Sequence, residues 1–286
     1  MNHFAAQDGA RLAYADEGQG LPLLALAGLT RDGRDFDYLE RRLPPGIRLI
    51  RLDSRGRGGS QWTGADTYTV PQEAQDVIAL LDHLALARVA VIGSSRGGLL
   101  GMVIAATQRQ RLLGLCLNDV GPVLERSGLQ RIAAYVGVEP AVHTLEEIAD
   151  RMPQAMPGFS RVPELRWVEE TIRHYVQLDG HVGLTYDPEL RTALEKALDA
   201  PAADAWPLFD ACAGLPLALI RGQNSDVLSA QTAQAMRQRR PDMGFAEVPD
   251  RGHVPFLDEP ASVACIRTWL TQVQAAFSGS AAPGSR

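Results

Sequence analysis

The sequence has little of what metal centres and disulfide frameworks require. Its 286 residues include only three cysteines, Cys116, Cys212 and Cys265, which lie far apart and form no Cys-x-x-Cys pair. This spacing supports neither a metal site nor a disulfide framework and is typical of buried thiols in a reducing compartment. The six histidines include no pair four residues apart on a predicted helix, so no metal is expected.

The sequence also lacks a net positive charge and long apolar segments. The formal net charge of -6 excludes a surface built to neutralise nucleic-acid phosphates or anionic lipid headgroups. The N-terminus lacks a basic start followed by an apolar run, and no later apolar stretch approaches the length of a membrane span. We therefore expect a cytoplasmic protein that acts on a small molecule, needs no cofactor and has no nucleic-acid or membrane partner. Its oligomeric state is left open.

What the sequence does contain is an alternation of apolar strands and amphipathic helices. Residues 21–29 form a nearly continuous apolar run, as expected for a central strand buried on both faces, and the Asp8-Gly9 pair before it predicts a hairpin. Further strands are predicted at 47–53, 88–93, 112–118, 215–220 and 244–248, with helices at 69–86 and 95–108. The order strand, helix, strand predicts a mostly parallel, doubly wound α/β sheet.

Residues 122–205 interrupt this alternation with helical patterns and several prolines. We predict that they form a helical cap inserted into a core made of residues 1–121 and 206–277, followed by a flexible tail at 278–286. Aromatic side chains near the cap are candidates for lining an apolar substrate pocket, although packing is their more common role. These candidates are Trp167, Tyr175 and Trp206.

The strongest chemical signal is the segment GSSRG at residues 93–97. It is a Gly-x-Ser-x-Gly motif that directly follows an apolar strand and opens a predicted helix. A serine on such a sharp turn has strained backbone angles, and the flanking glycines avoid collisions with neighbouring backbone. The motif predicts that Ser95 is a catalytic nucleophile, whereas Ser94 does not fit the pattern.

A serine hydroxyl is a weak nucleophile and needs a positioned base together with an acceptor that orients that base. His253 follows the predicted last strand and is the candidate base. Asp226, in the loop after strand 215–220, is the leading candidate for the acid, although it could be a helix cap. Asp119 ends strand 112–118 and is the second candidate, although it could belong to a turn. Asp250 is too close in sequence to His253.

Two backbone N–H groups are predicted to form an oxyanion hole. One belongs to Arg96, directly after the nucleophile, and the other to Leu29, with Gly28 allowing the turn. The Arg96 side chain could reach a substrate carboxylate or pair with a nearby acid such as Asp53. We expect the structural pairing.

Together the segments AGLTRDGRDF, LDSRGRGGS, GSSRGG, RGQNSDVL and RGHVPFLDEP resemble the motif set of the α/β-hydrolase superfamily, in the same order and over nearly the whole chain. The resemblance implies an eight-stranded core, a cap inserted after the sixth strand and hydrolysis of a carbonyl substrate. It also implies that the arginines of residues 53–60 make structural pairs. The sequence departs from the pattern at two positions. It has Ala27-Gly28 where many members have His-Gly, and it has Arg96 where an apolar residue is usual after the nucleophile.

The function expected from these residues is hydrolysis of a carboxylic ester or lactone of a small, largely apolar substrate through a Ser-His-Asp acyl-enzyme mechanism. One alternative is a carbon-carbon bond hydrolase of the dienoic diketone type, for which Arg96 is the only hint of a carboxylate site. Another is a ligand-binding protein with slow turnover on the same fold. The serine at position 95 disfavours hydrolases that need a carboxylate nucleophile.

Overall fold

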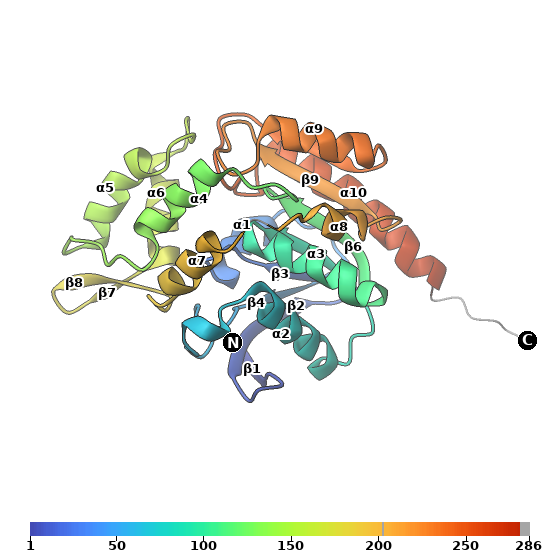
Figure 1. The fold of residues 1–286 in the computed structure, drawn as a ribbon, viewed down its shortest axis with the longest axis horizontal. Helices are drawn as coiled ribbons and strands as arrows, with labels where there is room; N and C mark the ends of the chain where they lie inside the picture. Colours follow the sequence, from blue (N-terminus) through green and yellow to red (C-terminus); the bar gives the residue numbers. More distant parts are fainter. Residues whose placement is uncertain (202, 281–286) are drawn as a thin grey trace, which may run out of the picture.

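The computed structural model describes residues 1–201 and 203–280 and is built around an eight-stranded sheet (Figure 1). Neighbouring strands are parallel except where β2 pairs with β1 and β4. The strand order is β1-β2-β4-β3-β5-β6-β9-β10, which confirms the predicted mostly parallel sheet. The strands are β1 (Asn2–Ala5), β2 (Arg11–Gly18), β3 (Leu21–Leu26), β4 (Ile47–Leu52), β5 (Val89–Ser94), β6 (Leu112–Asn118), β9 (Leu217–Gly222) and β10 (Gly244–Val248).

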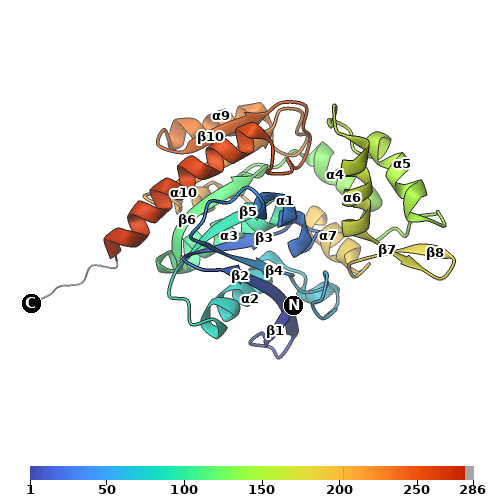
Figure 2. The same ribbon diagram turned by 180° about the vertical axis from the view of Figure 1, so that it is seen from behind.

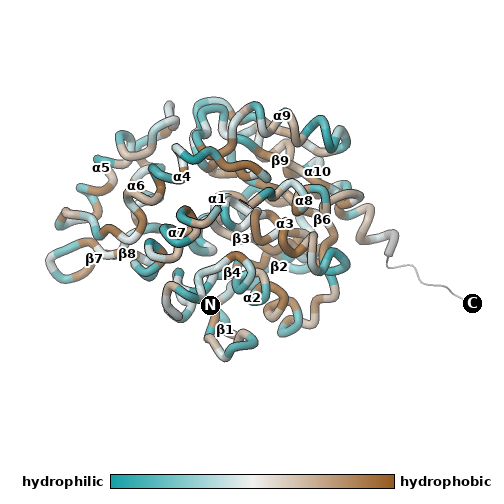
Figure 3. The backbone as a smooth tube through the Cα atoms, in the orientation of Figure 1, coloured by the Kyte–Doolittle hydropathy of each residue, from teal (hydrophilic) through white to brown (hydrophobic). Residues whose placement is uncertain are grey.

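The central strands are buried on both faces, as the apolar run at residues 21–29 predicts. Side chains alternate along β3, so that Leu24 and Leu26 belong to one hydrophobic cluster, whereas Leu23 and Ala25 belong to another. The hydrophobic segments accordingly gather in the centre of the molecule (Figure 3). Burial on both faces requires helices on both sides of the sheet.

Helices supply those two layers. The first cluster includes side chains of α2 (Val70–His83), α3 (Arg96–Gln108), α8 (Trp206–Asp210) and α9 (Ala230–Arg239). The second includes side chains of the short α1 (Asp37–Glu40) and the long α10 (Pro260–Ser280), which crosses the opposite side of the sheet (Figure 2). No helix among the described residues is long and apolar enough to cross a membrane.

The chain leaves the core after β6 and forms a group of helices to one side of the sheet before it returns at α8 (Figure 1). The elements of this cap are α4 (Arg126–Tyr135), α5 (Leu145–Ala155), α6 (Glu164–His174), β7 (Tyr175–Leu178), β8 (His181–Leu184) and α7 (Leu190–Asp199). The helical prediction for residues 122–205 is wrong at β7 and β8, which form a hairpin around Asp179-Gly180. Of the predicted tail, residues 281–286 lie outside the described residues.

Candidate active site

Ser95 stands on the tight turn that joins β5 to α3. Its backbone has φ 49° and ψ -114°, a strained conformation for a residue with a side chain. The turn passes so close to β3 that a Cβ at Gly97 would lie 2.0 Å from the carbonyl oxygen of Leu26. Only glycine fits there, which explains the second glycine of the motif. The turn presents the Ser95 hydroxyl at the carboxyl ends of the strands.

His253 connects that serine to a buried carboxylate. Its Nε2 lies 2.8 Å from Oγ of Ser95, and its Nδ1 lies 2.7 Å from Oδ2 of Asp119. The side chain of His253 is 8% exposed and that of Asp119 is fully buried. With Nδ1 donating to the carboxylate, Nε2 is left to accept the proton of the serine hydroxyl, which is the arrangement that a general base requires.

Asp119 is fixed from two further directions. Its Oδ1 accepts the backbone N–H of Gly222 at 2.8 Å, and its Oδ2 accepts the hydroxyl of Ser225 at 2.6 Å. The backbone of Asp119 has φ 57°, so the acid, like the nucleophile, occupies the left-handed region. Three donors therefore hold the carboxylate toward His253.

The predicted assignment of Asp226 as the partner of His253 is not what the structure shows. The Asp226 carboxylate accepts two hydrogen bonds from Arg131 of α4, from Nε at 2.6 Å and from Nη2 at 2.7 Å. Burial opposes ionisation, but the hydrogen bonds from Arg131 outweigh it and lower the pKa of Asp226. The second candidate, Asp119, takes the position because β6 is the immediate neighbour of β5 in the sheet, whereas Asp226 follows β9, one strand farther away.

The two predicted oxyanion donors lie beside the nucleophile. Arg96 is the first residue of α3, so its N–H has no acceptor within the helix. Leu29 and Gly28 line the same cleft as Ser95 and His253, and a Cβ at Gly28 would be 3.8 Å from Cβ of Ser95. The loop is held by Arg57, whose Nε donates to the carbonyl of Leu29 at 2.7 Å.

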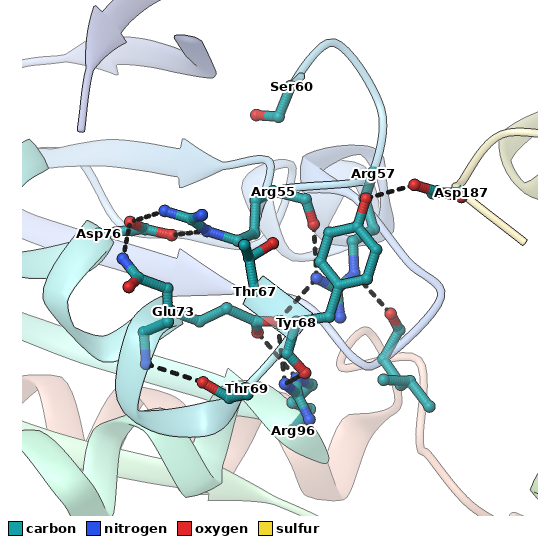
Figure 4. A network of polar contacts seen from close by, with 12 residues as sticks. Arg55, Arg57, Ser60, Thr67, Tyr68, Thr69, Glu73, Asp76, Arg96 and Asp187 are labelled. Carbon is teal, nitrogen blue, oxygen red and sulfur yellow. Dashed lines mark hydrogen bonds and ion pairs between the residues drawn. The ribbon is translucent and has the colours of Figure 1, made fainter. Parts of the chain in front are cut away.

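The side chain of Arg96 makes a structural pair, as expected, but with Glu73 and not with Asp53. Its Nε and Nη2 donate to the two carboxylate oxygens of Glu73 at 2.8 and 2.9 Å (Figure 4). Asp53 instead accepts the backbone N–H groups of Gly33 and Gly59. The Arg96 side chain is therefore turned away from substrate recognition.

Glu73 also binds Arg57, the residue that holds the carbonyl of Leu29. Nη1 of Arg57 donates to Oε1 of Glu73 at 2.8 Å, and both side chains are 1% exposed. Burial alone would raise the pKa of Glu73, but the two guanidinium groups outweigh it and lower the pKa to about 2. One buried carboxylate thus connects the supports of both predicted oxyanion donors.

The neighbouring Arg55 completes the structural pairing expected for residues 53–60. It is fully buried and donates from Nε and Nη2 to Asp76 at 2.6 Å, and from Nη1 to Asp8 at 2.9 Å. Figure 4 shows Asp76 and Glu73 on the same helix, with Asp76 facing Arg55 and Glu73 facing Arg57 and Arg96. The two buried acids of α2 therefore serve different partners.

The cleft above Ser95 is lined by apolar side chains together with several charged ones. The apolar lining residues include Leu29, Ile132, Met156, Phe256 and Leu257, and the charged ones are Arg31, Asp35, Arg131 and Glu170. None of the charged four was identified from the sequence as a substrate-site residue, because their positions in loop and cap carry no motif. The cleft is thus less apolar than expected.

The three aromatic candidates for the pocket lie outside this lining. Trp167 is 5% exposed and packs edge to face against Phe256, in a cluster that Tyr175 also contacts. Trp206 packs on Phe209 of the core, beneath the guanidinium of Arg239. Their predicted role in substrate binding is replaced by packing, the alternative considered for them.

A second polar cluster joins the cap to the loop after β3. Arg31 donates to Nδ1 of His174, and Nε2 of His174 lies 2.6 Å from Oδ1 of Asp35. Burial outweighs the attraction of Arg31 and raises the pKa of Asp35 to about 7, and burial also raises the pKa of Glu170. Near neutral pH Asp35 therefore carries less than its full negative charge.

A model of the alpha/beta hydrolase family matches residues 23–264. A curated relative, the 3-hydroxybutyrate-oligomer hydrolase of Cupriavidus necator, is 36% identical over 273 residues, which cover 91% of this chain and 93% of that protein. Its match extends over both core and cap. The sequence similarity between the two proteins is therefore not confined to the motifs around the serine.

Solved structures give the same result. The crystal structure of an alpha/beta hydrolase from Novosphingobium aromaticivorans is 37% identical and superposes with a TM-score of 0.89, covering 95% of this chain and 97% of the other. A thermophilic esterase from Thermogutta terrifontis, solved with malate bound, is 27% identical with a TM-score of 0.74, covering 96% and 99% of the two chains. The arrangement of core and cap is thus shared with other hydrolases.

Proposed function

The chain belongs to the alpha/beta hydrolase family and is an enzyme, and from the geometry of its cleft we propose that it is a serine hydrolase of carboxylic esters. The observation that carries the proposal is the continuous relay in which His253 lies 2.8 Å from Ser95 and 2.7 Å from Asp119. This is the constellation that activates a serine for acyl transfer. Ser95 is the nucleophile, His253 the general base and Asp119 the acid.

The mechanism proceeds in two displacements. His253 takes the proton of Ser95 as Oγ attacks the ester carbonyl, and the oxyanion of the tetrahedral intermediate is bound by the N–H groups of Leu29 and Arg96. His253 then gives the proton to the departing alcohol and an acyl-enzyme remains. Water, deprotonated by His253, attacks the acyl carbonyl, and collapse of the second intermediate returns the proton to Ser95.

For the substrate we propose short oligoesters of small hydroxy acids. The relative from Cupriavidus necator carries the name 3-hydroxybutyrate-oligomer hydrolase, and its similarity to this chain extends over almost the full length of both proteins. Such an oligomer combines short aliphatic segments with polar ends. The lining of the cleft, with Leu29, Ile132 and Met156 on one hand and charged side chains on the other, suits that combination.

The direct test is the intact mass of the protein after treatment with a fluorophosphonate probe. We expect one adduct on the wild type, none on Ser95→Ala, and the wild-type adduct on Ser94→Ala, since Ser94 precedes the turn. Hydrolysis of 3-hydroxybutyrate oligomers by the untreated wild type, which the probe has shown to carry a reactive serine, then supports the substrate class. A folded wild type that takes no adduct would contradict the serine mechanism.

The two alternative functions find less support. The carbon-carbon bond hydrolase requires a carboxylate site, for which Arg96 is the only hint in the sequence, and the Arg96 side chain is bound to Glu73 instead. A ligand-binding protein with slow turnover would show stabilisation by ligand without product, which the same oligomer assay detects. The cytoplasmic location stays a prediction from the sequence.

A further inference from the structure

Arg131 projects from the cap into the cleft that holds the nucleophile. The cleft is lined by Arg131, Ile132 and Tyr135, all from α4, together with Ser95 and His253. Residues 131 and 135 lie one turn apart on the helix and so face the same side. The mechanism described above uses neither of them.

The position of Arg131 is fixed by its neighbours. Asp226 binds Nε and Nη2 at 2.6 and 2.7 Å, and the N-terminal end of α4 is fastened to the same loop because the N–H of Glu125 donates to the carbonyl of Val227 at 2.9 Å. The helix passes so close that a Cβ at Gly128 would lie 2.3 Å from the carbonyl oxygen of Asp226. Little conformational freedom is left for Arg131 to lose on binding a ligand.

One edge of the guanidinium stays open. Among the described residues Nη1 of Arg131 has no hydrogen-bond partner, and the side chain is 32% exposed. The hydroxyl of Tyr135, a residue that is 49% exposed, also has no partner in the part of the chain that the structure describes. Two unused donors on one helix face therefore point to an acceptor that comes from outside the protein.

The charge of the cleft is compatible with an anion. Arg31 has its own partners in Asp35, Glu170 and His174, and the raised pKa of Asp35, about 7, reduces the negative charge of that acid near neutral pH. Asp226 balances Arg131 on one edge only. A planar anion on the open edge would gain charge-assisted hydrogen bonds, the stronger class of such bonds.

We propose that Arg131 and Tyr135 form a recognition site for the free carboxylate of the substrate, so that the enzyme cuts oligoesters at the unit that carries their carboxyl end. The inference rests on the proposed ester hydrolysis and adds the part of the substrate that is recognised. Asp226, which the sequence suggests as the catalytic acid, then acts through Arg131 as a positioning residue. A neutral ester of the same length would lack the group that the site binds.

The test compares two substrates that differ in one group, the linear dimer of 3-hydroxybutyrate and the same dimer with its carboxylate replaced by a primary carboxamide. We expect the wild type to prefer the carboxylate form in kcat/KM by about tenfold to a hundredfold, the range of a charge-assisted hydrogen bond. Arg131→Met should remove this preference by lowering kcat/KM for the acid alone. Arg131→Lys should retain part of it.

Matched variants separate recognition from folding. Arg126→Met removes an exposed arginine from the same helix and should leave the preference intact. Asp226→Asn should raise KM for the acid more than it lowers kcat, because Arg131 loses its fixed orientation. Hydrolysis of the carboxamide by each variant reports whether the active site is still assembled.

The outcomes are distinguishable from failure of the proposed function. A wild type without preference between acid and carboxamide, or an Arg131→Met variant that loses both substrates equally, overturns the carboxylate site while ester hydrolysis stands. A wild type that hydrolyses a simple aryl ester but neither dimer also overturns it. A wild type that hydrolyses no ester at all overturns both proposals.

Discussion

Both carboxylate oxygens of Glu73 accept hydrogen bonds from the guanidinium of Arg96, at 2.8 and 2.9 Å, although Arg96 directly follows the nucleophile in the sequence. The same carboxylate binds Arg57, which holds the carbonyl of Leu29. The two backbone donors of the proposed oxyanion hole come from segments 67 residues apart, and this buried acid connects them. Glu73 touches no reacting atom and is a positioning residue.

We expect Glu73→Gln to lower kcat by about tenfold to a hundredfold with little change in KM, because a small displacement of an oxyanion donor weakens transition-state binding alone. A boronic acid that mimics the tetrahedral intermediate should lose affinity by the same factor. The product acid, which lacks the oxyanion, should bind as before.

Asp76→Asn is the matched control for this variant. Asp76 is a buried acid on the same helix, but it pairs with Arg55 and has no bond to Arg57 or Arg96. Both substitutions break a buried ion pair and should destabilise the fold by on the order of 3 kcal/mol. If Asp76→Asn reduces boronic acid affinity as strongly as Glu73→Gln, a general loss of packing explains both and the positioning role fails.

Glu73 also makes stability dependent on pH in the acid range. Arg57 and Arg96 lower its pKa to about 2 in the folded state, against an ordinary value of 4.5. The carboxylate therefore stabilises the fold fully above about pH 4.5, and this contribution is lost as the pH falls toward 2. In urea unfolding between pH 7 and 3.5, the stability gap between wild type and Glu73→Gln should narrow below pH 4.5. A constant gap would contradict the assignment.

The choice between the two candidate acids is tested by Asp119→Asn. The structure pairs Asp119 with Nδ1 of His253, so the amide should leave the imidazole in the wrong tautomer and lower kcat by about a thousandfold to ten-thousandfold. Asp250→Asn is the control, because Asp250 lies three residues before His253 and bonds to Ser160 of the cap instead. Equal losses in both variants would argue against a special role for Asp119.

Much of the fold follows from patterns that act locally. A continuous apolar run such as β3 can be buried only between two helical layers, and a Cβ at Gly93 would collide with the backbone of Gly97 and Gly98 in the same turn. These features need no knowledge of distant partners. The same holds for the strand-helix alternation of the core.

The acid of the triad and the lining of the cleft depend on contacts between distant segments. Asp119 and Asp226 both follow strands, but β6 is the neighbour of β5 in the sheet, and Arg131 of the cap binds Asp226. Ser225, beside Asp226 in the sequence, is the residue that reaches Asp119. Aromatic composition was likewise a poor guide, because Trp167 fills the cap interior while Arg31 and Glu170 line the cleft.

Asp35 should make substrate binding dependent on pH near neutrality. Burial raises its pKa to about 7, so it is largely neutral below that pH and negative above it. The groups that face it are Arg31 and Asp32 from its own loop and Glu170, Arg173 and His174 from α6. Ionisation of Asp35 adds a negative charge to the cleft and opposes the binding of an anionic substrate.

We therefore expect KM for the carboxylate dimer to rise by about threefold to tenfold between pH 6 and 8, whereas KM for the carboxamide stays nearly constant. Asp35→Asn keeps an oxygen for His174 and should remove most of the rise. The measurement is the ratio of the two KM values across this range in wild type and variant. Because His253 acts on both substrates alike, its contribution cancels in the ratio. A ratio that does not change with pH in the wild type would show that Asp35 stays in one protonation state or that no carboxylate is bound near it.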